Sequence, residues 1–151
     1  FKKDSTFRVK LSSPNGVIDE NKQNNHLTSI ATIPLKLPTK FILKIHTNNV
    51  GRAQENMFTI TDSEGEVYFS DDNFEDDTDY NYNINLKKGC YQFLLTDAME
   101  DGISVHWWYR NSNPELAGIN GSVTILSMND EEFYNFKPDF GEELRLNFVV
   151  E

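Results

Sequence analysis

The sequence predicts an all-β protein, an antiparallel β-sandwich of jelly-roll type with about nine to ten strands. Three observations support this prediction. Short runs alternate apolar and polar residues, turn residues separate these runs about every ten positions, and no segment has the period of an amphipathic helix. With 151 residues, 13% aromatic and 25% charged, the chain is long and apolar enough for one globular core.

The N-terminal part is the least regular. Phe7, Val9 and Leu11 alternate as in a strand, and residues 12–16 (Ser-Ser-Pro-Asn-Gly) end that run. Residues 19–26 are almost entirely polar, which is typical of a loop. Residues 1–26 are therefore either a peripheral strand or a linker.

From residue 27 onward the strand pattern is regular. The two prolines at 34 and 38 bracket the connection between the first two of these strands, where a missing N–H does not interrupt a ladder. We expect one helical turn at 130–134 and strands at 28–33, 40–47, 57–62, 66–70, 80–86, 90–96, 103–109, 122–128 and 144–150.

These elements predict one sandwich domain over residues 1–151. The chain starts at Phe1 without a methionine, carries no signal peptide and has no apolar run long enough to span a membrane. We expect it to be a fragment of a longer protein.

The charge distribution limits the partners. The formal net charge is −10, which argues against nucleic acid and against anionic membrane surfaces. Ten acidic residues and no lysine or arginine lie between Arg52 and Lys87. Such a run is either a solvated loop or a partial contributor to cation binding.

A second acidic segment has a more specific pattern. Asp97, Glu100 and Asp101 lie within five residues between two predicted strands, and Gly102 lets the backbone turn sharply. Several oxygens on a tight loop are what a hard cation requires, and Ca²⁺ is the ion that such loops usually bind. The alternative is an acidic hairpin loop that binds no ion.

Three consecutive aromatic residues, Trp107, Trp108 and Tyr109, follow this loop. Neighbours in a strand point to opposite faces, so at least one large ring is either exposed or covered by residues 110–120. An exposed ring would suit the flat face of a sugar. The alternative is that all three rings pack under loops.

Catalytic patterns are absent from the sequence. His26, His46 and His106 are far apart and form no zinc-binding spacing, and no Gly-x-Ser-x-Gly motif occurs. Cys90 cannot form an internal disulfide, and its place in a predicted strand favours a small buried side chain. We therefore expect no enzymatic activity.

Several short motifs, in this order, resemble a β-sandwich accessory module of secreted bacterial proteins. The motifs are Gly89-Cys90-Tyr91, Thr96-Asp97, Asp101-Gly102-Ile103 and Trp107-Trp108, preceded by residues 56–65 and followed by Pro138-Asp139-Phe140-Gly141. The resemblance covers about residues 40–151. In such proteins the module lies beside metallopeptidase and peptide-N-glycosidase-related domains.

The resemblance implies a secreted, non-catalytic jelly-roll module, Ca²⁺-stabilised, that docks to or spaces a neighbouring catalytic domain of the same chain. It carries over to Asp97, Asp101, Gly102 and the two tryptophans. Two departures are Ala98-Met99-Glu100 between the acids and the long segment 110–120. The expected state is a monomer. The alternative functions are a carbohydrate- or glycoprotein-binding module and, less favoured, an enzyme fragment.

Overall fold

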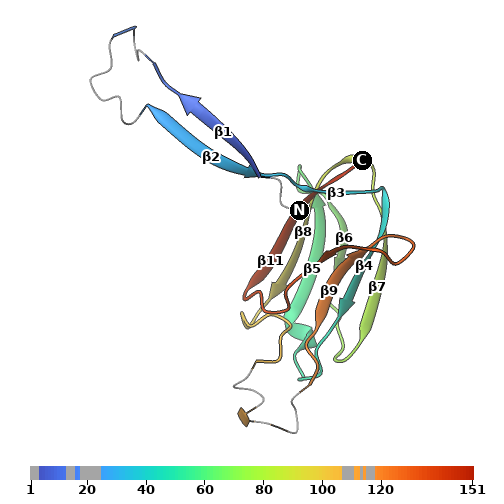
Figure 1. The fold of residues 1–151 in the computed structure, drawn as a ribbon. Coiled ribbons are helices and arrows are strands. Elements are labelled where there is room, and N and C mark those ends of the chain that lie inside the picture. The colour runs from blue at the N-terminus through green and yellow to red at the C-terminus, as the bar shows by residue number, and fades with distance from the viewer. Residues whose placement is uncertain (1–3, 13–15, 18–24, 107–110, 113, 115–117) are drawn as a thin grey trace. The chain divides into compact units, whose positions relative to one another are not determined.

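The computed structural model describes residues 4–12, 16–17, 25–106, 111–112, 114 and 118–151. Contacts between residues divide the chain into two compact units, Phe1–Pro34 and Leu35–Glu151. Each unit has its own strands (Figure 1).

The first unit contains an antiparallel pair of strands, β1 (Asp4–Lys10) and β2 (His26–Thr32). Val9 lies opposite Leu27 in this pair, and both side chains are exposed. The alternation of apolar residues thus correctly predicted a strand near the N-terminus.

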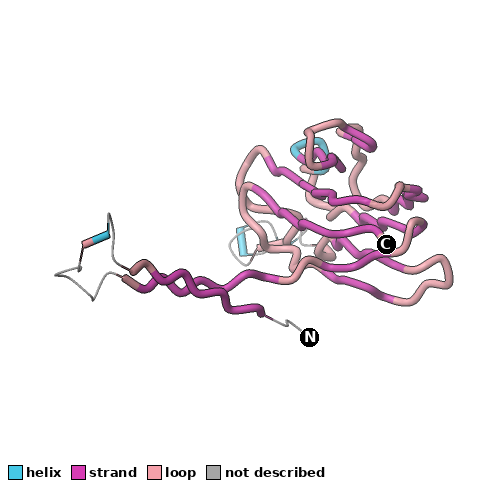
Figure 2. The backbone as a smooth tube through the Cα atoms, turned by 90° about the horizontal axis from the view of Figure 1, so that it is seen from above, coloured by secondary structure: helices cyan, strands magenta, loops and turns pink. Residues whose placement is uncertain are grey.

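The second unit is a sandwich of two sheets, so the predicted all-β sandwich is confirmed. One sheet has the strand order β10-β9-β4-β7 and the other the order β3-β11-β8-β5-β6. Figure 1 labels these strands except β10, and Figure 2 shows the strands in magenta from above. All pairs are antiparallel except β3 with β11. The elements are β3 (Leu35–Leu37), β4 (Lys40–His46), the 3₁₀-helix η3 (Ala53–Glu55), β5 (Asn56–Asp62), β6 (Val67–Asp71), β7 (Asp79–Asn85), β8 (Gly89–Asp97), β9 (Ser122–Leu126), β10 (Glu132–Asn135) and β11 (Glu143–Val150).

The core lies between the two sheets and follows from the two-residue period of the strands. Phe41 of β4 packs edge-on against Phe148 of β11, with ring centroids 5.8 Å apart. Phe58 of β5 meets Tyr82 of β7 at 4.7 Å. Each fully buried large apolar side chain contributes about 1.5–3 kcal/mol. The largest buried side chains come from both sheets and from two loops, which contribute Phe74 and Ile103: Phe41, Phe58, Phe74, Phe93, Phe148, Leu37, Leu43, Ile45, Ile60, Ile84, Leu95 and Ile103.

The predicted helical turn at 130–134 is wrong, because the chain forms strand β10 there. The N–H of Ser127 donates to the carbonyl of Glu131, and the Ser127 hydroxyl accepts from the N–H groups of Asn129 and Glu131. This tight turn reverses the chain so that β10 pairs with β9. The local hydrogen bonds of Ser127 therefore stabilise a hairpin instead of a helical turn.

The predicted strand at 103–109 is also wrong over its described part, residues 103–106. The N–H of Ile103 donates to the carbonyl of Pro138, and the N–H of Val105 donates to the side-chain oxygen of Asn120. These backbone groups are satisfied by loops rather than by a neighbouring strand.

Cys90 is exposed, whereas the sequence favoured a buried side chain. In β8 the inward positions are Tyr91, Phe93, Leu95 and Asp97, so position 90 faces outward. Among the described residues, no helix is long and apolar enough to cross a membrane.

Candidate cation centre

The alternation of β8 determines where the site lies. Tyr91, Phe93 and Leu95 point into the core, and the same period carries Asp97 to the inner face at the last position of the strand. Asp97 is only 2% exposed. A carboxylate is therefore placed where an apolar side chain would otherwise sit, and it needs a compensating partner.

The neighbouring strand β5 brings in a second acid. Its first residue, Asn56, lies opposite Asp97 in the antiparallel register. Glu55 ends η3 immediately before β5, and its carbonyl accepts a hydrogen bond from the N–H of Ala98 at 3.0 Å. The start of one strand thus meets the end of the other at the same edge of the sheet.

Three carboxylates converge at this edge. One oxygen each from Glu55, Asp97 and Asp101 lies within 4.8 Å of the other two. Of the residues predicted from the sequence, the structure brings Asp97 and Asp101 together. Glu100, the third residue predicted, is exposed and is not one of the three converging carboxylates. The third carboxylate is that of Glu55.

The loop after β8 is held in shape by Asp97 itself. One carboxylate oxygen, Oδ1, accepts hydrogen bonds from the N–H groups of Met99 and Asp101 at 3.0 and 3.2 Å. Gly102 then adopts a left-handed φ of +66°, and a Cβ there would lie 2.6 Å from the carbonyl oxygen of Pro138. Only glycine fits this position without displacing the backbone.

Glu55 and Asp97 each have one buried carboxylate oxygen that accepts no hydrogen bond from the described residues. Oδ2 of Asp97 and Oε2 of Glu55 are buried and have no hydrogen-bond partner among the described residues. Burial raises the pKa of Asp97, opposed by the backbone N–H groups that donate to it. Burial also raises the pKa of Glu55, with Arg52 lowering it and the neighbouring carboxylates raising it further. Buried oxygens that lack donors need a cation or a proton.

Arg52 and His106 border the outer side of the cluster. Arg52 Nη1 donates to Asp101 Oδ2 at 2.7 Å, and Nε2 of His106 lies 2.8 Å from the carbonyl oxygen of Asp101. An open hollow of about 610 Å³ adjoins Asp101. It is lined by Arg52, Met99, Glu100, Asp101, His106 and Asp139. Both members of the Arg52–Asp101 ion pair thus line this hollow.

The donor set decides which cation fits. The three converging groups offer only oxygen, which suits Ca²⁺ and Mg²⁺ and disfavours soft metals. Mg²⁺ demands a tight octahedron at about 2.0–2.1 Å, whereas Ca²⁺ accepts irregular sites with ligands at about 2.3–2.6 Å. A loose cluster at the junction of two strands and a loop fits Ca²⁺ better.

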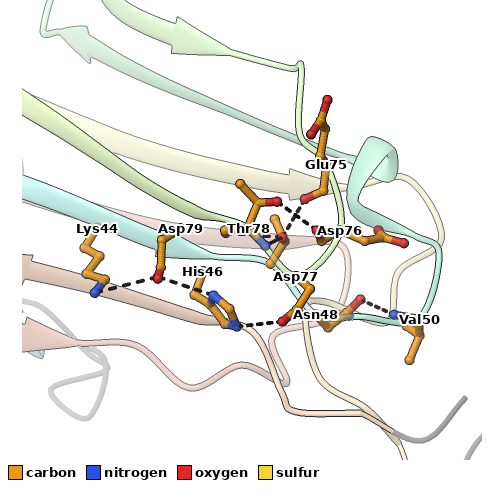
Figure 3. Close-up of polar contacts among 10 residues, drawn as sticks. Lys44, His46, Asn48, Val50, Glu75, Asp76, Asp77, Thr78 and Asp79 are labelled. Carbon is orange, nitrogen blue, oxygen red and sulfur yellow. Dashed lines mark hydrogen bonds and ion pairs between the residues drawn. The ribbon is translucent and has the colours of Figure 1, made fainter.

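The acidic segment 71–79 is arranged differently. In Figure 3, His46 lies between Asp77 and Asp79, and Lys44 lies beside Asp79. His46 Nε2 is 3.7 Å from Asp77 Oδ1 and Nδ1 is 3.3 Å from Asp79 Oδ1, while Lys44 Nζ is 3.7 Å from Asp79 Oδ1. Asp76 accepts a hydrogen bond from the N–H of Ala53 at 2.9 Å. Several of these acids thus have protein partners at the surface, and none belongs to the converging cluster of the described residues.

The predicted aromatic ligand site, Trp107, Trp108 and Tyr109, lies outside the described residues. Among the described residues, Tyr68 and Tyr134 are exposed aromatic side chains. They lie on β6 and β10, which are edge strands of different sheets.

Glu55 was missed by sequence reasoning because it precedes Asp97 by 42 positions and belongs to the charge run that resembles a solvated loop. The available signal was its position two residues before the strand predicted at 57–62. An acid at that position could be recognised only by knowing that β5 pairs with β8 in antiparallel register.

Comparison of the chain with family models, with curated protein sequences and with solved structures finds no match. Evidence for a function therefore comes from the residues themselves and from the motifs in residues 40–151.

Proposed function

We propose that this chain is a non-catalytic β-sandwich accessory module, stabilised by Ca²⁺, that docks to or spaces a catalytic domain within a larger secreted protein. The observation that carries the calcium proposal is the convergence of Glu55, Asp97 and Asp101 at one edge of the sandwich. The buried, donor-free oxygens of the first two make a cation the natural complement.

The accessory role is supported by the motifs that resemble modules beside metallopeptidase and peptide-N-glycosidase-related domains. It is also consistent with the chemistry of the cluster. The converging acids are tied to backbone N–H groups and to Arg52, as in a structural centre that holds a loop in place. No reaction is assigned to the module.

Thermal unfolding with and without calcium tests the proposal. A ligand that binds only the folded state stabilises it by about 2.7 kcal/mol at a hundredfold excess over Kd. For a chain of this size that raises Tm by roughly 5–10 °C. We expect this rise with millimolar Ca²⁺, its reversal by a chelator, and its loss in Glu55→Gln.

The matched control is Asp72→Asn, which removes one exposed acid of the segment 71–79 and should keep the full calcium response. Identical melting curves with calcium and with chelator would rule out the cation centre. The docking role is tested separately, by measuring whether the calcium-loaded module binds the catalytic domain encoded with it.

A further inference from the structure

A third buried oxygen without a donor lies beside the cluster, on Asn56. Its side chain is 5% exposed, and Oδ1 has no hydrogen-bond partner among the described residues. An unpaired buried amide oxygen lowers the stability of the folded state, so it requires an explanation.

The orientation of this amide is determined by its nitrogen. Nδ2 of Asn56 donates to the carbonyl oxygens of Arg52 and Ala53, each at 3.3 Å. Rotating the amide by half a turn would place its oxygen against those two carbonyls. Oδ1 therefore faces away from η3.

The register places the Asn56 side chain beside that of Asp97. Asn56 lies directly opposite Asp97 on neighbouring strands, and both side chains occupy inward positions. Such pairs have Cβ atoms about 4.5–5.5 Å apart. Glu55, whose Oε2 also lacks a donor, is the adjacent residue.

We infer that Asn56 is a fourth ligand of the cation centre and supplies a neutral oxygen through Oδ1. This inference rests on the proposed calcium site and adds a residue that the acidic pattern does not include. Ca²⁺ takes about six to eight oxygens and readily accepts amide carbonyls beside carboxylates. With Asn56, the donors come from both strands and from the loop after β8.

Two substitutions at Asn56 separate a ligand from a merely structural residue. Both Asn56→Asp and Asn56→Ala remove the hydrogen bonds of Nδ2 to η3, so a structural role predicts that both weaken calcium binding alike. A ligand role predicts opposite shifts. Asn56→Asp retains the oxygen and adds charge, so Kd should fall by about tenfold, while Asn56→Ala should raise Kd by about tenfold.

Calcium titration by calorimetry measures these constants, with the far-ultraviolet circular dichroism spectrum as the check of folding. Asn83→Asp is the control for the added charge, because Asn83 is an exposed residue of β7, in the sheet that does not contain β5 and β8. Its calcium affinity should equal that of the wild type. If the Asn56 variants fold only with calcium, the calcium concentration at which each folds replaces Kd as the readout: a lower concentration for Asn56→Asp than for Asn56→Ala supports the ligand role, and equal concentrations contradict it.

The outcomes distinguish the two proposals. Wild-type binding together with equal weakening in both Asn56 variants would overturn the assignment of Asn56 and leave the carboxylate site intact. Absence of calcium binding in the wild type and in Asn56→Asp would overturn both. Opposite shifts in the two variants would support both.

Discussion

Two acidic segments of this protein differ in what they do with their charge. Residues 71–79 hold six acids and residues 97–101 hold three, yet the converging carboxylates include two from the smaller group. In the larger group Asp71 accepts the Tyr82 hydroxyl at 2.7 Å, and Asp77 and Asp79 flank a histidine. In the smaller group Asp97 is buried with one oxygen lacking a donor among the described residues.

The difference teaches that the density of acids along the chain is a poor guide to a cation site. Exposed carboxylates find water and nearby donors, and a cation adds little to them. A carboxylate at an inward position of a strand is shielded from water. An oxygen of it that accepts no hydrogen bond must therefore be neutralised by a proton, a protein cation or a metal ion.

The largest expected effect is that of Gly102→Ala. This substitution tests whether the loop after β8 requires the left-handed backbone conformation of Gly102. The left-handed φ and the 2.6 Å approach of a Cβ to Pro138 predict a loss of about 3 kcal/mol or more of unfolding free energy. Gly65→Ala is the control, since Gly65 has a φ of +87° but no atom within 4 Å of the added Cβ. It should cost about 1 kcal/mol. Urea denaturation measures both, and equal losses would contradict the steric argument.

The next effect compares one acid from each segment. Asp97→Asn should abolish the rise in Tm with calcium, because it removes the buried charge and replaces one carboxylate oxygen with an NH₂ group, which cannot bind a cation. Asp77→Asn should leave that rise unchanged, because Asp77 is exposed and lies outside the cluster. Melting curves at matched calcium concentrations check this. A lost response in Asp77→Asn would mean that the segment 71–79 takes part in cation binding.

The smallest effect is a dependence on pH in the absence of calcium. Burial raises the pKa of Asp97 in the folded protein, so this carboxyl binds its proton more tightly folded than unfolded. Proton binding by Asp97 therefore stabilises the folded state. This stabilisation is fully present below the ordinary carboxyl pKa of about 4 and is lost as the pH rises through the raised pKa of the folded state. In chelator, Asp97→Asn should therefore gain Tm relative to wild type as pH increases from about 4 to 7.

Calcium should reverse that trend in the wild type, because protons compete with the cation for the same oxygens. The difference in Tm between samples with and without calcium should grow with pH. A difference that does not change over this range would show that Asp97 does not exchange a proton for a cation.

The fold could be predicted from the sequence because its main signals are local. The alternation of Phe41, Leu43 and Ile45, and that of Val123 and Ile125, identifies strands whose inward side chains are 1% exposed in the structure. Where hydrogen bonds to distant loops replace a ladder, as at Ile103 and Val105, the local pattern predicted a strand that does not form.

The sequence by itself determined the β class, most strand positions and two of the three converging acids. The reason is that the two-residue period of the strands, the turn residues and the loop around Gly102 each depend on a few neighbouring positions. The pairing of β5 with β8 was decided only by the tertiary structure. That pairing brings Glu55 and Asn56 to Asp97 across more than 40 positions of chain. These oxygens become buried only when the two sheets pack together. Burial removes the water that would otherwise hydrate them, so that a bound cation can compensate their charge.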